Sequence, residues 1–283
     1  MKRSLSILLA LCLALSLAAC SSSSAPASAP AGSTPAESAP AGDEAGCSHE
    51  WAPATYALPE TCTLCGETRG EAKPTYFAEN GITASPVPGD GEEVPLTYLT
   101  YATEAPEIMT VRDNGIVTFS QTIEPAEEEG YQLVTLNVTL TLLITGDDSS
   151  LYASTTVWNN ALYDLYSGRK VPGRSIMSDD GFSYEAELTV DDVEYLLRYE
   201  KNNEWETSPW IEMEDGGLCL YKWCYQTIEF LLPEGYDGLI YALIPALEVP
   251  SDSAFEAIDE SETYVLDLTP EELEGAAFFR VGV

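Results

Sequence analysis

The sequence predicts a mainly β protein whose large C-terminal part, residues 75–283, folds as a β-sandwich. Two observations lead to this fold class. Apolar and polar residues alternate over several stretches of strand length, which is typical of antiparallel strands with one buried and one solvated face. Helical signals are few, so eight or more candidate strands have to pack against one another as sheets.

Residues 1–19 have the features of a lipoprotein signal peptide. Lys2 and Arg3 precede an apolar run, Leu5–Leu17, that is shorter than the roughly 18 to 20 residues needed to span a bilayer. The run leads into Leu-Ala-Ala-Cys, ending at Cys20, which resembles the lipobox of bacterial lipoproteins. The resemblance implies that the Cys20 thiol carries an acyl chain, such as palmitate, and anchors the protein on the extracytoplasmic face of the cell membrane. An ordinary secretory cleavage site with an accidental cysteine is the alternative.

The segment 20–46 continues from this cysteine as a linker made almost wholly of Ser, Ala, Pro, Gly and Thr. Such a composition has too little apolar surface to offset the entropy lost on ordering, and its Ala-Pro pairs favour extended conformations. We therefore expect a disordered tether that holds the folded part away from the membrane.

The chain is strongly acidic, with 47 Asp and Glu residues against 12 Lys and Arg residues and a formal net charge of −35. This charge argues against nucleic acid as a partner and against adhesion to anionic lipid headgroups. Cationic partners and calcium are compatible with it, and plain solvation of the surface is the alternative.

Residues 47–74 contain four side chains that can bind a soft metal: Cys47, His49, Cys62 and Cys65. In Cys-Thr-Leu-Cys-Gly, two thiolates two residues apart can bind one ion, and the glycine tolerates the positive φ of the turn. Together the four residues form a tetrahedral Cys3His set without an open position, which predicts a structural zinc ion.

The reason for a metal is that so short a segment cannot build a sufficient apolar core. We expect Trp51 and Leu58 to pack over the ion. A disulfide is one alternative, although lipidation of Cys20 leaves an odd number of cysteines beyond it. A segment with neither metal nor disulfide is the other.

These residues also carry a family resemblance. Cys-x-His-x-Trp-x-x-Ala-Thr followed by Pro-x-Thr-Cys-x-x-Cys-Gly-x-Thr-x-Gly resembles a zinc-ribbon-like repeat common in surface proteins of gut Firmicutes, and it covers about a tenth of the chain. The chain departs from the repeat at Tyr56, where the family has cysteine, and at Lys73–Tyr76, where the family continues into Gly-His-x-Trp. Both departures remove spare ligands and leave one tetrahedral set, although they are equally typical of a degenerate copy without metal.

Beyond this module, alternation is clearest in Val134–Ile144, whose even-numbered positions are apolar, and it recurs in Phe182–Val190. Asp113-Asn114-Gly115 predicts a hairpin turn because these residue types tolerate positive φ. Thr269 followed by Pro270 predicts an N-cap and a short helical turn. The remaining candidate strands are Ile108–Arg112, Ile116–Ile123, Ser154–Val157, Glu194–Tyr199, Leu218–Leu232, Leu239–Ile244 and Phe278–Val281.

The pattern of Tyr131–Ile144, Tyr225–Leu232 and Leu239–Ile244 resembles telokin-like immunoglobulin-fold domains of Gram-positive lipoproteins. The resemblance implies an immunoglobulin-like β-sandwich over residues 75–283. One elaborated domain and an extra hairpin layer from Tyr76–Glu124 are both compatible with the pattern. On a continuous strand Cys219 and Cys224 lie on opposite faces and about 16 Å apart. This is too far for a disulfide, so we expect separate buried thiols.

Catalytic motifs are weak. Ser167-x-x-Lys170 is followed by Val-Pro-Gly, although acyl-enzyme chemistry places such a serine at the start of a long helix. The sole histidine, His49, belongs to the metal set, so a hydrolase has no histidine base elsewhere. Turn formation is the preferred explanation for three acid pairs that could also bind calcium: Asp147-Asp148, Asp179-Asp180 and Asp191-Asp192. An aromatic set is the best candidate for a binding face, with core or sheet surface preferred: Trp205, Trp210, Tyr221, Trp223 and Tyr225.

We therefore expect a lipid-anchored extracytoplasmic binding protein with a structural zinc module, no catalytic site, and a cell-surface protein or glycan as its ligand. A carboxylate-dependent glycosidase-like surface enzyme is one alternative, to be recognised by two carboxylates about 5 to 9 Å apart in an open groove. A lipoprotein that captures metal for a transporter is the other.

Overall fold

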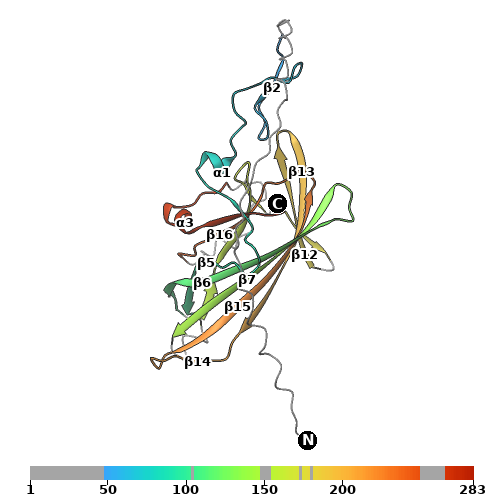
Figure 1. Cartoon of the computed structure of the whole chain (residues 1–283). Helices are drawn as coiled ribbons and strands as arrows, with labels where there is room; N and C mark the ends of the chain where they lie inside the picture. Colours follow the sequence, from blue (N-terminus) through green and yellow to red (C-terminus); the bar gives the residue numbers. More distant parts are fainter. Residues whose placement is uncertain (1–47, 103–104, 147–153, 172–173, 179–180, 249–264) are drawn as a thin grey trace, which may run out of the picture. The chain divides into compact units, whose positions relative to one another are not determined.

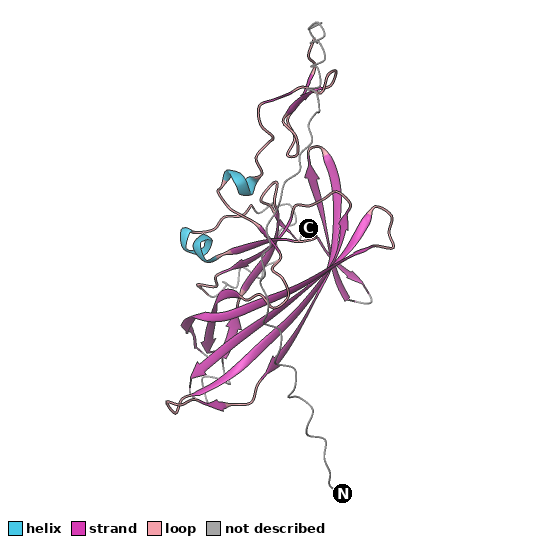
Figure 2. Cartoon of the chain, in the orientation of Figure 1, coloured by secondary structure: helices cyan, strands magenta, loops and turns pink. Residues whose placement is uncertain are grey.

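The computed structural model of the chain describes residues 48–102, 105–146, 154–171, 174–178, 181–248 and 265–283. Strands dominate these residues, and the helices are short (Figure 2). The predicted mainly β, sandwich-like fold is confirmed. Cys20, the linker and Cys47 lie outside the described residues, as do the acid pairs at 147–148 and 179–180.

The largest sheet has nine strands in the order β11-β12-β13-β15-β7-β6-β5-β8, with β14 paired to β15, and every pairing is antiparallel (Figure 1). Its strands are β5 (Val94–Ala102), β6 (Ala105–Pro125), β7 (Tyr131–Gly146), β8 (Ser154–Val157), β11 (Arg174–Ser178), β12 (Gly181–Val190), β13 (Val193–Thr207), β14 (Ile211–Glu212) and β15 (Leu218–Pro233).

A second sheet has the order β10-β9-β16-β17-β4, and its last pair, β17 with β4, is parallel. A third, small sheet has the order β1-β2-β3. The remaining elements are β1 (Trp51–Ala52), β2 (Glu60–Cys62), β3 (Thr68–Arg69), α1 (Tyr76–Glu79), β4 (Ser85–Pro86), β9 (Asn159–Asp164), β10 (Lys170–Val171), β16 (Leu239–Ile244), α3 (Pro270–Gly275) and β17 (Ala277–Arg280).

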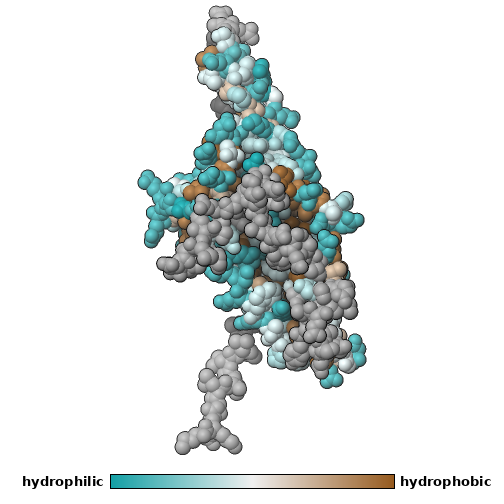
Figure 3. Space-filling view, turned by 180° about the vertical axis from the view of Figure 1, so that it is seen from behind, coloured by the Kyte–Doolittle hydropathy of each residue, from teal (hydrophilic) through white to brown (hydrophobic). Residues whose placement is uncertain are grey.

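The main hydrophobic core forms between the two larger sheets. The even-numbered apolar side chains of β7, from Val134 to Leu142, are all buried, as the alternation predicted. They belong to one cluster with Leu162 of β9, Tyr241 of β16 and Phe279 of β17. Burial of apolar side chains at this density supplies most of the stability of such a sandwich. On the face seen in Figure 3, hydrophilic side chains predominate among the described residues, as the net charge leads one to expect.

The central strand of the second sheet, β16, is buried on both faces. All six residues of β16 are buried, because a second cluster covers the face that points away from the main core. Phe77 of α1 and Leu266 join that cluster and pack with Phe278 of β17. The short helix α1 is therefore a cover for the sheet, and the sequence analysis did not predict it.

The predicted hairpin at Asp113-Asn114-Gly115 is wrong, because β6 runs through these residues without turning. A Cβ atom on Gly115 would lie 2.7 Å from the carbonyl oxygen of Leu96. The register between β5 and β6 shifts between Leu96 and Tyr98, next to this close approach. The glycine therefore permits an irregular, tight strand pairing rather than a chain reversal.

The other candidate strands are confirmed, and several extend further than the pattern indicated, as β13 does when it continues to Thr207. The helical turn at Thr269 is also confirmed, with a complete capping box between Thr269 and Glu272. β5 and β6 are part of the largest sheet, so the structure shows no separate hairpin layer among the described residues. Cys219 and Cys224 are buried on β15 and form no disulfide.

Candidate metal centre

The small sheet positions three of the four predicted metal ligands. His49 lies two residues before the start of β1, Cys62 ends β2, and Cys65 lies in the turn between β2 and β3. The antiparallel register places Trp51 opposite Cys62, which brings the chain near His49 alongside the end of β2. His49 is thereby brought to the same end of the sheet as Cys62 and Cys65, which are 13 and 16 positions away in the sequence.

The turn after Cys62 has the geometry of a metal knuckle. The Gly66 N–H donates to the carbonyl oxygen of Cys62 at 2.9 Å, and the Cys62 N–H donates to the carbonyl oxygen of Glu67 at 2.7 Å. Gly66 has a φ of 76°, a conformation that side chains other than glycine adopt only with strain. The positive φ of the glycine after the second cysteine is as predicted from the sequence.

The ligand atoms of His49, Cys62 and Cys65 all lie within 4.8 Å of one another, so this group can hold a metal ion. The Sγ atom of Cys65 is 3.6 Å from Nδ1 of His49. In a tetrahedral site with Zn–S near 2.3 Å and Zn–N near 2.0 Å, sulfur and nitrogen ligands are about 3.5 Å apart. The separation of Cys65 Sγ and His49 Nδ1 therefore matches that of two ligands of one zinc ion.

The second nitrogen of His49 faces a carboxylate. Its Nε2 atom lies 3.4 Å from Oε2 of Glu67, while Nδ1 faces Cys65. A metal-binding histidine commonly donates its other ring N–H to a carboxylate, which fixes the ring and its tautomer. The sequence analysis did not predict a role for Glu67, although its position two residues after Cys65 was the available signal.

Trp51 covers one side of this histidine, as predicted. The two rings stack at 5.1 Å with an interplanar angle of 20°, and the Arg69 guanidinium lies 4.3 Å from the centre of the Trp51 ring. Arg69 in turn pairs with Glu60. The predicted packing of Leu58 over the site is wrong, because its side chain is 56% exposed.

The surroundings of the Cys62 thiol lower its pKa. Burial opposes ionisation, but hydrogen bonds from the backbone of Leu64 and of Cys65, and from the side chains of His49 and Cys65, lower the pKa of Cys62 to about 6. The thiolate is the form that binds a metal. The lowered pKa therefore favours the metal-binding form of Cys62 at neutral pH.

Apolar burial contributes little to this segment. Within residues 48–74, all of which the structure describes, Cys62 alone is buried. No disulfide joins Cys62 to Cys65. A fold of this size without a core generally needs a cross-link or a metal.

One turn of the largest sheet holds the segment against the sandwich. Asp191 and Asp192 form the two-residue turn between β12 and β13, and both have positive φ. The Asp191 carboxylate accepts a hydrogen bond from the backbone N–H of Tyr56 at 2.7 Å and another from Nζ of Lys73 at 3.0 Å. This acid pair is therefore turn-forming, as preferred, and Asp191 is engaged by the chain itself.

Tyr56 packs against the sandwich with its ring 4.8 Å from that of Tyr166. This residue thus makes a contact with the larger domain. Sequence reasoning missed this contact because Tyr56 and Asp191 are 135 positions apart and neither stands in a motif for it.

The weaker candidates do not assemble into a site. Ser167 lies in the turn between β9 and β10, where its hydroxyl donates to Asp164, and it starts no helix. The aromatic set is divided: Tyr221, Trp223 and Tyr225 share one face of β15, whereas the register places Trp205 on the opposite face, beside Cys224. Trp210 packs with Ile144 and Leu220.

Neither helix in the described ranges has the length and apolar character required to cross a membrane. Comparisons with protein-family models, with curated proteins and with solved structures found no match to this chain.

Proposed function

We propose that His49, Cys62 and Cys65, with Cys47 as the fourth ligand, bind one structural zinc ion that maintains the fold of residues 47–74. The observation that carries this proposal is the convergence of three ligand atoms within 4.8 Å in a segment whose described residues, 48–74, include one buried side chain. Three thiolates and one imidazole form a donor set that zinc takes in closed structural sites. A closed set has no position for a reacting water, so the ion acts on folding.

Metal analysis of the full-length protein, purified under reducing conditions, tests the proposal. We expect one zinc ion per chain and an X-ray absorption spectrum with three sulfur ligands at about 2.3 Å and one nitrogen ligand at about 2.0 Å. A metal-free protein in which residues 48–74 are nevertheless ordered would contradict it.

We further propose that the chain is a lipid-anchored extracytoplasmic binding protein rather than an enzyme. The lipobox-like run ending at Cys20 supports the anchor, and the placement of the single histidine in the metal cluster supports a role without hydrolase chemistry. Metabolic labelling with a palmitate analogue should mark the wild-type protein and leave Cys20→Ala unlabelled. Equal labelling of both proteins, or release of wild-type protein from the membrane, would contradict the anchor.

Two acids that hydrogen-bond with the same tyrosine, Asp164 and Asp237, give the glycosidase alternative no support. Asp164 and Asp237 both contact Tyr166, but Asp164 is buried and accepts hydrogen bonds from Ser167 and Tyr236. Asp237 forms an ion pair with Arg280. Both carboxylates are thus occupied in holding the turn after β9 against the chain beyond β15.

Metal capture differs from the structural role in its kinetics. A closed site exchanges its ion slowly, whereas a transfer site releases zinc rapidly to a weak chelator. We expect slow exchange, and complete transfer within seconds would favour capture.

A further inference from the structure

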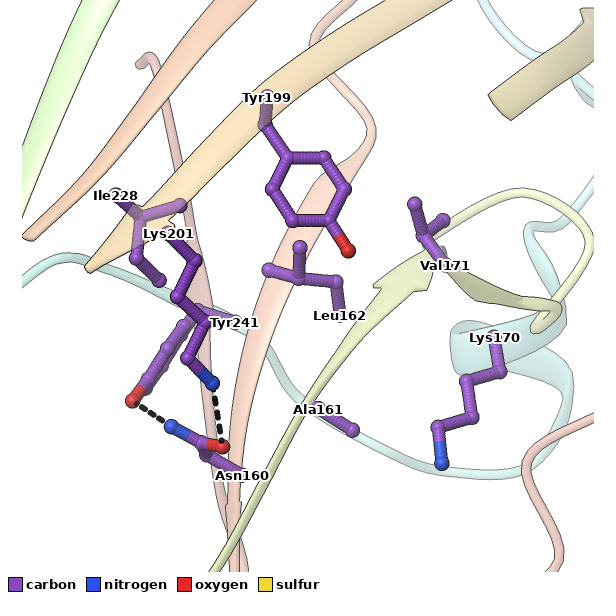
Figure 4. A pocket seen from close by; sticks show the side chains of 9 residues that line it. All are labelled: Asn160, Ala161, Leu162, Lys170, Val171, Tyr199, Lys201, Ile228 and Tyr241. Atoms are coloured by element: carbon purple, nitrogen blue, oxygen red, sulfur yellow. Dashed lines mark hydrogen bonds between the residues drawn. The ribbon is translucent and has the colours of Figure 1, made fainter. Parts of the chain in front are cut away.

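A small pocket opens between the two larger sheets, where β9 and the edge strand β10 face β13 and β15 (Figure 4). Its volume is about 90 Å³. Leu162, Val171 and Ile228 supply apolar walls, and the ring of Tyr199 lies beside them. Asn160 and Lys201 bring polar groups to the same space.

The amide groups around the pocket are satisfied by one another. Asn160 Nδ2 donates to Gln226 Oε1 at 2.9 Å and to the Tyr241 hydroxyl at 2.8 Å, and Gln226 Nε2 donates to Asn203 Oδ1 at 2.9 Å. The Lys201 ammonium is different, because within the described ranges it makes one hydrogen bond, a long one to Asn160 Oδ1 at 3.4 Å. An ammonium has three N–H donors, so Lys201 retains donors for a ligand.

The charge of Lys201 is also unbalanced. The chain carries 47 acidic residues, and four basic side chains in the described ranges form ion pairs with them: Arg69, Lys73, Arg198 and Arg280. No described carboxylate lies within ion-pair distance of Lys201, or of Lys170 at the rim of the pocket. Burial removes water from the charged form of Lys201 and so lowers its pKa. A partly buried cation without a counter-ion is costly unless an anion binds to it.

We propose that this pocket binds a short aliphatic monocarboxylate, whose carboxylate accepts hydrogen bonds from Lys201 while its alkyl chain lies against the apolar walls. The volume suits a ligand of a few heavy atoms, well below the roughly 300 to 1,000 Å³ of sites for drug-sized molecules. The Lys201 ammonium inside the pocket balances one negative charge, whereas the second charge of a phosphate dianion would face only the exposed Lys170 at the rim. The inference rests on the proposed binding role, which it supplies with a ligand class, and it is independent of the metal centre.

Ligand-observed NMR with butyrate, on the full-length protein, tests this site. We expect saturable binding of butyrate and no saturable binding of n-butanol, which has the same chain length without the charge. Inorganic phosphate is the second comparison ligand. Lys201-dependent binding of phosphate in place of butyrate would overturn the assignment to a carboxylate, and the lack of saturable binding by butyrate would overturn the site.

Variants locate the binding. Lys201→Met should weaken butyrate binding at least tenfold, and Lys201→Arg should retain part of it. Lys222→Met is the matched control: Lys222 lies on the same face of the sheet, 4.6 Å from the centre of the Trp205 ring, and does not line the pocket. Equal losses in the two methionine variants would overturn the proposal.

Two further measurements distinguish a loss of butyrate binding from misfolding of the variant and from a loss of zinc. Thermal unfolding should show that Lys201→Met folds at least as stably as the wild type, since it removes an unbalanced charge. Zinc content, measured on the same samples, reports on the metal centre alone. A zinc-loaded protein that does not bind butyrate therefore rejects the pocket without rejecting the module.

Discussion

The N-terminal module and the sandwich show two opposite ways of stabilising a β-sheet. Residues 48–74 form three strands, each two or three residues long. Together these residues bury a single side chain, that of the candidate ligand Cys62. In the sandwich, β7 and β15 are 16 residues long and place alternate apolar side chains in a continuous core. The first region depends on a few polar groups that converge at one point, and the second on apolar area spread over many residues.

The difference predicts different responses to the same perturbation. Loss of a single ligand removes most of the stabilisation of the module, because a metal site needs its complete donor set. Loss of a single core side chain removes only a share of the stabilisation of the sandwich, because the remaining burial is unchanged. The turn at Asp191 joins the two regions, and changes there test whether they are mechanically coupled.

The largest effect is expected for the double variant Cys62→Ser, Cys65→Ser. Zinc content should fall from one ion per chain to none, because two of the four thiolate and imidazole donors are removed. Elemental analysis measures the change. Cys219→Ser is the matched control, since Cys219 is a buried cysteine outside the cluster, and it should retain its zinc. Zinc retained in the double variant would place the ion elsewhere.

Leu136→Ala tests the sandwich in the same way. Leu136 is fully buried in the main core, so truncation should lower the free energy of unfolding by about 2 to 5 kcal/mol. Denaturant unfolding measures the loss, and zinc content should stay unchanged. Ile123→Ala, on the neighbouring strand and 44% exposed, should cost less than about 1 kcal/mol. Equal costs at the two positions would contradict the assignment of the core.

Asp191→Asn tests the junction. Asparagine tolerates the positive φ of this turn but removes the charge that strengthens the hydrogen bond from Tyr56. We expect a loss of about 1 kcal/mol at the junction, which would accelerate hydrogen exchange of the Tyr56 amide several-fold. Asp192→Asn, at the adjacent turn position, should leave that exchange unchanged. Identical exchange in wild type and Asp191→Asn would show that the junction does not protect Tyr56.

The smallest effect is expected for Lys73→Met. The Lys73–Asp191 pair is partly exposed, and such ion pairs are weakened by solvent and salt. The hydrogen bond with Asp191 raises the pKa of Lys73, so the contribution is present at neutral pH and is lost only as the pH rises through that raised pKa. Exchange of the Tyr56 amide should change less than in Asp191→Asn, and the change should vanish in about 1 M salt. An effect as large as that of Asp191→Asn would contradict this ranking.

Local patterns predicted much of the sandwich. The alternation in β7 and the Thr-Pro-Glu-Glu start of α3 depend on side chains close in sequence, and both are as expected. The strand β9, Asn159–Asp164, was missed because its two faces are both covered and its sequence starts with two asparagines, so no alternation marks it. The glycine at 115 was assigned to a turn because a close approach to another strand leaves the same local signature as a reversal.

The candidate site likewise contains residues that local sequence patterns predicted and contacts that only the complete fold creates. Spacing along the chain predicted Cys62, Cys65 and Gly66, since a knuckle is a local structure. Other contacts depend on the complete fold. Tyr56 and Asp191 are 135 positions apart in the sequence, and Lys201 and Asn160 are 41 positions apart. No motif links such residues, so only the assembled sheets bring them together.

Hydrogen exchange measured with and without a zinc chelator tests most directly the claim that the two regions are stabilised by different means. We expect chelation to abolish protection in residues 48–74, while protection of β7 and β15 in the sandwich is unchanged. Unchanged protection of the module after complete removal of metal would contradict this division, as would simultaneous loss of protection in both regions.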